Sequence, residues 1–80
     1  CGDFNAPRGR ATFARLASTY ADAIPAHHTT SIDASLHRAG QLNLMVDGLF
    51  HTAAVSAREV TFHPGVSDHY ALTATLTLAE

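Results

Sequence analysis

The final third of the chain contains the pattern that most constrains its fold. Between residues 71 and 78, leucine or alanine alternates with threonine, as Leu72, Ala74, Leu76 and Leu78 are separated by single threonines. A period of two is that of a β-strand with one apolar and one polar face. The sequence therefore predicts a half-buried strand over residues 71–78.

A polar triplet, Ser67, Asp68 and His69, stands almost directly before this strand. A carboxylate and an imidazole at the mouth of a strand form a compact site for a cation and a proton. The alternative is structural, because Ser and Asp after a loop commonly act as turn or capping groups.

Two further motifs place polar groups near short apolar runs. In residues 2–5 (GDFN), Asp3 and Asn5 are two positions apart, so a continued strand would project both to one side, whereas an Asx turn is the alternative. In residues 42–50, Asp47 is the one ionisable group of an apolar run, and a buried carboxylate needs a partner. An Asp-Gly hairpin turn is the alternative there, but it would leave the next strand too short. We therefore favour a central strand over 42–50 that carries a functional Asp47.

The rest of the chain predicts one helix and shorter elements. An early proline and an apolar stripe at Phe13, Leu16, Ala17 and Tyr20 predict a helix over residues 7–20. Residues 29–32 and 58–63 fit short strands, and residues 52–57 a loop or helical turn. The predicted fold class is α/β, with one mainly antiparallel sheet and a covering helix.

Composition excludes several classes of protein. Eighty residues make one small domain, and no apolar run approaches the roughly 20 residues of a membrane span. A net charge of −2 is too weak to attract a polyanion over a broad face, although Arg8 with Arg10, and His37 with Arg38, are candidate phosphate contacts. The alternative for both pairs is a solvated surface. One cysteine cannot form an internal disulfide, which favours a reducing, cytoplasmic compartment.

In their order along the chain, the motifs GDFN, MVDGLF and SDH resemble the later half of the endonuclease/exonuclease/phosphatase family. The resemblance implies a four-layer sandwich, of which residues 1–80 supply the C-terminal portion, and a phosphoesterase that uses Mg²⁺, or alternatively Mn²⁺. It implies that Asp3 activates water and that Asn5 holds the phosphate or completes the metal shell. It also implies that His69 stabilises charge or transfers protons, that Asp47 fixes the His69 tautomer, and that Asp68 lies beside the metal. The candidate catalytic residues are thus Asp3, Asn5, Asp47 and His69, and the candidate metal ligands Asp3, Asn5, Asp68 and His69.

The chain also departs from the family pattern. The family's first half, with an Asn and a metal-binding Glu, has no counterpart in these 80 residues, so we expect the isolated chain to be inactive and prone to associate. Its expected partners are that N-terminal half and a phosphate ester. A phosphodiester is preferred to a phosphomonoester, and nucleic acid is one candidate phosphodiester. The alternative is a non-catalytic module of the same descent that binds a partner through an exposed sheet edge. We expect the four candidate catalytic residues to converge at one edge of a single sheet, with Asp47 hydrogen-bonded to His69.

Overall fold

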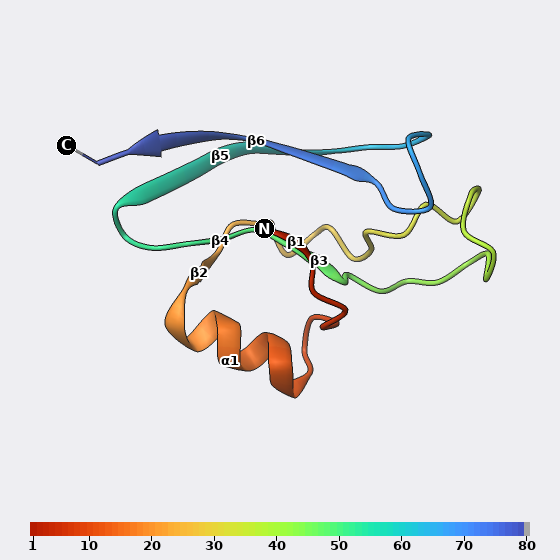
Figure 1. The fold of residues 1–80 in the computed structure, drawn as a ribbon, viewed down its shortest axis with the longest axis horizontal. Coiled ribbons are helices and arrows are strands. Elements are labelled where there is room, and N and C mark those ends of the chain that lie inside the picture. Colours follow the sequence, from red (N-terminus) through yellow and green to blue (C-terminus); the bar gives the residue numbers. More distant parts are fainter. Residues whose placement is uncertain (80) are drawn as a thin grey trace.

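The computed structural model describes residues 1–79 and has one short helix and three antiparallel strand pairs (Figure 1). The elements, in order, are β1 (Gly2–Asp3), α1 (Ala11–Thr19), β2 (Ala21–Asp22), β3 (Asp47–Gly48), β4 (Phe50–His51), β5 (Val55–His63) and β6 (Ala71–Leu78). Strand β1 pairs with β3, β2 with β4, and β5 with β6. The α/β class and the antiparallel pairing are confirmed. The expected single sheet is wrong, because the described strands form three separate two-stranded sheets.

The β5–β6 hairpin is the longest regular element, and β6 is the strand predicted from the leucine–threonine alternation. Its two strands run along one side of the molecule, above the layer that holds the short strands (Figure 1). The register pairs Val55 with Leu78 at one end and His63 with Ala71 at the other. Strand β5 therefore begins at Val55, within the segment that was predicted to be a loop.

A bulge in β5 explains that error. Arg58 lies opposite Thr75 but Thr61 lies opposite Thr73, so β5 has one residue more than β6 in this interval. Glu59 sits in the bulge with φ 56°, a left-handed conformation. The extra residue inverts the alternation, which puts Phe62 on the same side of the hairpin as Val55 although an odd number of positions separates them. The alternation seen over residues 58–63 therefore does not continue in the same phase to Val55, and it could not predict the start of the strand.

The predicted continuous strand over residues 42–50 is interrupted. Only Asp47–Gly48 and Phe50–His51 are strand, while the carbonyl groups just before them accept hydrogen bonds from three different segments. Leu44 O accepts from Ser31 N at 3.0 Å, Val46 O accepts from Phe4 N at 3.0 Å, and Leu49 O accepts from Ala23 N at 2.8 Å. Asp47 and Gly48 lie opposite β1, so they do not form the hairpin turn that was the alternative.

The helix is shorter than predicted. It begins at Ala11 because Arg10 has extended backbone angles (φ −106°, ψ 170°), and Pro7 O accepts a hydrogen bond from Arg10 N in a preceding turn. Phe13 packs against Phe50 with the ring centroids 5.6 Å apart. Tyr20, at the end of the predicted stripe, is 43% exposed, so the helix covers its neighbours only in part.

The core lies in the layer between the helix and the β5–β6 hairpin (Figure 1). Its buried apolar side chains are Ala6, Ile24, Ile32, Met45 and Val46. Two polar residues, Ser31 and Asp33, are buried among them. In the described part of the chain, no helix is long and apolar enough to cross a membrane.

Candidate functional site

His69 lies between two carboxylates, one near each ring nitrogen. Its Nδ1 is 2.7 Å from Asp47 Oδ2, and its Nε2 is 3.9 Å from Asp3 Oδ2. Exposure increases across the three side chains, from 17% for Asp47 through 25% for His69 to 42% for Asp3. We call Asp47 and His69 the dyad. The Nδ1 side of the His69 ring, next to Asp47, is the more enclosed. The Nε2 side, next to Asp3, is open to solvent.

Backbone pairing brings these three residues together from distant parts of the sequence. Asp3 and Asp47 are register partners in the β1–β3 pair, and directly opposite residues project to the same face. His69 forms an isolated antiparallel bridge with Ile32, next to the hydrogen bond from Tyr70 N to Ser31 O at 2.8 Å. The expected hydrogen bond between Asp47 and His69 is confirmed. The residues meet across strand pairs and a bridge, however, and not at the edge of one sheet.

The electrostatic surroundings of His69 favour its charged form. The hydrogen bond to Asp47 raises the pKa of His69 above its usual value of 6.5, against the opposing effect of partial burial. The negative charges of Asp47, Asp3 and Asp68 add to the increase. The ring therefore retains a proton more readily than an isolated histidine, which suits a group that donates a proton or stabilises negative charge.

Asp3 and Asn5 do not project together as a continued strand would require. Asn5 has φ 48°, and its backbone N donates to Asp3 Oδ1 at 2.9 Å, so the chain leaves β1 in the Asx turn that was the alternative. The side chain of Asn5 is exposed and, within residues 1–79, makes no hydrogen bond to the dyad. The turn leaves Asp3 Oδ2 directed towards His69. The predicted convergence thus holds for Asp3, Asp47 and His69, whereas the role of the Asn5 side chain stays a prediction.

A metal site is not assembled by the described residues alone. They contain no group of three or more His, Cys, Asp or Glu side chains with the geometry to hold a metal ion. Asp68 is exposed, and its carbonyl oxygen accepts a hydrogen bond from Asp33 N at 2.9 Å. Magnesium needs near-octahedral oxygen ligation. The predicted ligands Asp3, Asn5, Asp68 and His69 stay a prediction for part of such a shell.

No sequence pattern indicated the structural role of Ser31. It is fully buried, and its Oγ accepts hydrogen bonds from Val46 N at 3.0 Å and Asp47 N at 3.2 Å. Ser31 thereby supports the strand that carries Asp47. The only sequence signal was a pair of polar residues, Ser31 and Asp33, on either side of a single isoleucine in an irregular segment.

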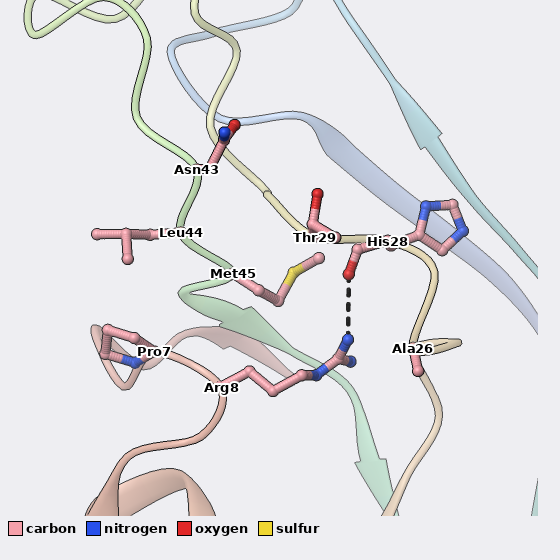
Figure 2. A pocket seen from close by; sticks show the side chains of 8 residues that line it. All are labelled: Pro7, Arg8, Ala26, His28, Thr29, Asn43, Leu44 and Met45. Carbon is pink, nitrogen blue, oxygen red and sulfur yellow. Dashed lines mark hydrogen bonds between the residues drawn. The ribbon is translucent and has the colours of Figure 1, made fainter.

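Arg8, a candidate phosphate contact, has a structural role. Its guanidinium group bonds to Asp22 Oδ2 at 3.1 Å, to Ile24 O at 2.9 Å and to His28 O at 3.1 Å. Figure 2 shows the last of these bonds at the edge of a cavity of about 210 Å³ lined also by Met45. These partners engage both terminal nitrogens of the guanidinium, so the structure favours a structural role for Arg8 over a phosphate contact.

The other predicted phosphate contacts, Arg10, His37 and Arg38, make no hydrogen bond to the dyad within residues 1–79. Arg10 is exposed at the start of α1. His37 Nδ1 accepts a hydrogen bond from Ala39 N at 3.0 Å, which stabilises a local turn, and Arg38 is exposed beside it. These residues fit the alternative interpretation, a solvated surface, better than a phosphate contact.

Comparison of the chain with protein-family models, with curated proteins and with solved structures finds no match. The family resemblance therefore stays a prediction. It is carried by the three motifs and by the observation that each of them contributes one member of the Asp3–His69–Asp47 cluster.

Proposed function

We propose that this chain is part of a phosphoesterase domain of the endonuclease/exonuclease/phosphatase type, with the sandwich fold of that family, which hydrolyses phosphodiester bonds. The observation that carries the proposal is the placement of His69 between Asp47 and Asp3. The carboxylate of Asp47 orients the ring. The carboxylate of Asp3 lies on the exposed side of the ring, where a substrate would bind. An imidazole with this support is the usual arrangement for proton transfer at a reacting oxygen.

Asp47 acts as a positioning residue. Its carboxylate accepts a hydrogen bond from His69 Nδ1–H, which leaves Nε2 as the nitrogen that faces the substrate. When the ring is protonated, Nε2–H donates to a phosphoryl oxygen or to the leaving oxygen. The raised pKa of His69 maintains that protonated form towards neutral pH.

Asp3 acts on the attacking water. The 3.9 Å between its Oδ2 and His69 Nε2 is too long for a direct hydrogen bond, so each group is free to face a different oxygen of the bound ester. Asp3 takes a proton from water as the new O–P bond forms. The bond from phosphorus to the leaving oxygen breaks, and His69 protonates that oxygen.

Magnesium is proposed for the complete domain only. A bound divalent cation would neutralise phosphoryl oxygens and lower the pKa of water. Asp3, Asn5 and Asp68 are the candidate ligands from this chain, together with the Glu that the resemblance implies elsewhere in the domain. The steps above use none of that chemistry, because the described residues group no full ligand set.

The second candidate function is a non-catalytic module that binds a partner chain. It is favoured by the exposed apolar side chains of the β5–β6 hairpin, where Leu76 is 57% and Leu78 is 74% exposed. A binding module has no need for the oriented His69, however, so the geometry of the dyad favours the enzyme.

The deciding experiment measures hydrolysis of bis(4-nitrophenyl) phosphate with Mg²⁺ by the complete domain, in which this chain joins the Glu-bearing half. We expect His69→Ala and Asp3→Asn each to lower kcat by roughly 10²–10⁴-fold, with a smaller change in KM, because both groups act in the transition state. Arg10→Ala is the matched control on an exposed side chain and should change kcat little. Near-normal kcat in the His69 variant would show the proposal to be wrong, and absence of hydrolysis by the unsubstituted domain would favour the binding module.

A further inference from the structure

One short segment, residues 31–33, is bonded to Asp47 and to the two neighbours of His69, Asp68 and Tyr70. Ser31 Oγ accepts from Asp47 N, and Ile32 forms the bridge with His69. Asp33 N donates to Asp68 O at 2.9 Å. The segment therefore lies between the strand that carries Asp47 and the loop that carries His69, and fixes their separation.

The carboxylate of Asp33 makes the most distant of these connections. Its Oδ2 accepts a hydrogen bond from Gly65 N at 2.9 Å, across 32 positions of sequence. Its Oδ1 accepts from Ser35 Oγ at 2.6 Å and from Ser35 N at 3.1 Å. Asp33 is only 4% exposed, and three donors satisfy a carboxylate that would otherwise be costly to bury. The bonds from the Ser35 hydroxyl and the Gly65 amide also keep the pKa of Asp33 below its usual value, so it stays charged.

The loop held by this carboxylate has little other support. Residues 64–68 are all exposed, and Val66 at their centre is 69% exposed. Within residues 1–79, Ser67 Oγ bonds to the backbone of His69, just after the loop, and to no other segment. Gly65 has φ 82°, a left-handed conformation that favours glycine, and this turn directs its N–H to Asp33. The loop is thus tied to the core at Gly65 by the side chain of Asp33, and at Asp68 and Tyr70 by backbone bonds.

We propose that Asp33 is a positioning residue for the dyad, and that its carboxylate holds loop 64–68 so that the His69 ring meets Asp47. The catalytic consequence of this role rests on the proposed function, but the positioning itself does not. Asp33 touches neither ring nitrogen and acts through Gly65. A carboxylate with a merely structural role would stabilise the whole fold and would have no particular effect on the His69 ring.

The experiment uses NMR on the 80-residue chain, with hydrogen exchange of the backbone amides and of the His69 Nδ1 proton as the readouts. In the unsubstituted chain, both the Gly65 amide and the Nδ1 proton should be protected. Asp33→Ala should speed exchange at Gly65 by about 10- to 100-fold, the range expected for losing a hydrogen bond to a charged group, and should remove protection of the Nδ1 proton. Asp33→Asn retains one acceptor oxygen, so its exchange rates should lie between those of the unsubstituted chain and of Asp33→Ala. Amides of the β5–β6 hairpin should keep their protection.

Asp22→Asn is the matched control, because Asp22 is also a partly buried carboxylate that caps a turn, at Ile24 N, but it is bonded to Arg8 and not to the loop. It should leave the His69 Nδ1 proton unchanged. Equal effects of the Asp22 and Asp33 variants on the His69 ring would overturn the proposal, as would an unchanged ring in folded Asp33 variants. If neither Asp33 variant folds, the unsubstituted chain still decides. If the Gly65 amide exchanges freely while the His69 Nδ1 proton is protected, the proposal is overturned. If both protons are protected to a similar degree, it is supported.

The outcomes separate the two proposals. Phosphodiester hydrolysis by the complete domain tests the proposed function, whereas the exchange measurements need no substrate. A dyad that loses its order in the Asp33 variants, in a domain that hydrolyses nothing, would support the positioning role and contradict the phosphoesterase.

Discussion

His69 Nδ1 lies 2.7 Å from Asp47 Oδ2, although 22 positions of sequence separate the two residues. Asp47 is fixed by its pairing with Asp3 across β1 and β3, and His69 by its bridge to Ile32. Because both residues are placed by backbone hydrogen bonds, their contact depends on the buried segment between them.

Ser31→Ala tests that dependence. The substitution leaves Val46 N and Asp47 N without their acceptor in a fully buried position. We expect the free energy of unfolding to fall by about 1–3 kcal/mol, the usual cost of unsatisfied buried groups. Urea denaturation measures the change. Ser18→Ala is the matched control, since the hydroxyl of Ser18 is exposed and donates to Arg15 O on the helix, and it should change stability by no more than about 0.5 kcal/mol. Equal losses in both variants would contradict the role of Ser31.

Titration of His69 should make stability depend on pH. Its pKa is raised in the folded chain above the unfolded value of 6.5, so the folded state binds the proton more tightly. The resulting stabilisation is complete below about pH 6.5 and is lost as pH rises through the folded-state pKa. The difference in unfolding free energy between the chain and its His69→Gln variant should therefore be larger at about pH 5.5 than at about pH 8.5.

His28 supplies the control of opposite sign. Burial, and then the nearby His27 and Arg8, lower the pKa of His28, so its contribution is present above pH 6.5 and is lost as pH falls. The same comparison with His28→Gln should show the reverse trend. A His69 difference that does not vary with pH would contradict the electrostatic account of the dyad.

The conformation of Glu59 predicts a stabilising substitution. Glu59 has φ 56° at the bulge of β5, where a side chain costs roughly 1 kcal/mol relative to glycine. Glu59→Gly should raise the free energy of unfolding by about 0.5 kcal/mol, after loss of the exposed hydrogen bond from Thr75 Oγ1. Ser56→Gly, at an exposed position in the regular part of β5, should instead lower it by about 0.5–1 kcal/mol. Urea denaturation again measures both, and a loss of stability in Glu59→Gly would show that the bulge is not strained.

The parts of the fold that were predictable from sequence are those with one dominant local cause. Alternation over residues 71–78 defined β6, and a lone carboxylate in an apolar run required a partner for Asp47. The bulge at Glu59 was not predictable. Its extra residue inverts the alternation of apolar and polar positions, so the two parts of β5 have patterns that do not match each other.

The supporting residues of the site were hidden for a different reason. Ser31 and Asp33 act by bonding to backbone groups of distant segments, at Asp47 and Gly65, and no local pattern indicates such partners. Asn5 was misplaced because an Asx turn and a continued strand have the same residue spacing. Arg8 is oriented by Asp22 and two carbonyl groups that only the tertiary structure brings near.

The exposed leucines of β6 predict self-association. Leu76 and Leu78 lie on one face of the hairpin, opposite Ala57 and Val55, and both are more than half exposed. An apolar strand face without a cover tends to bind another copy. We expect the isolated chain to sediment as more than a monomer at about 100 μM, and Leu76→Thr combined with Leu78→Thr to lower its mass towards that of a monomer. Thr77→Ser, on the other face, is the control and should leave the mass unchanged. A monomeric unsubstituted chain at this concentration would contradict the expectation.

The most direct test of the central claim, that Asp47 and His69 act as one unit, is a double-mutant cycle on phosphodiester turnover by the complete domain. Asp47→Ala should lower kcat by about 10–100-fold, because the ring loses its orienting acceptor. His69→Ala should lower it further, and the double variant should match His69→Ala alone, since Asp47 has no function without the ring. If the two losses multiply in the double variant, the residues act independently and the dyad account is wrong.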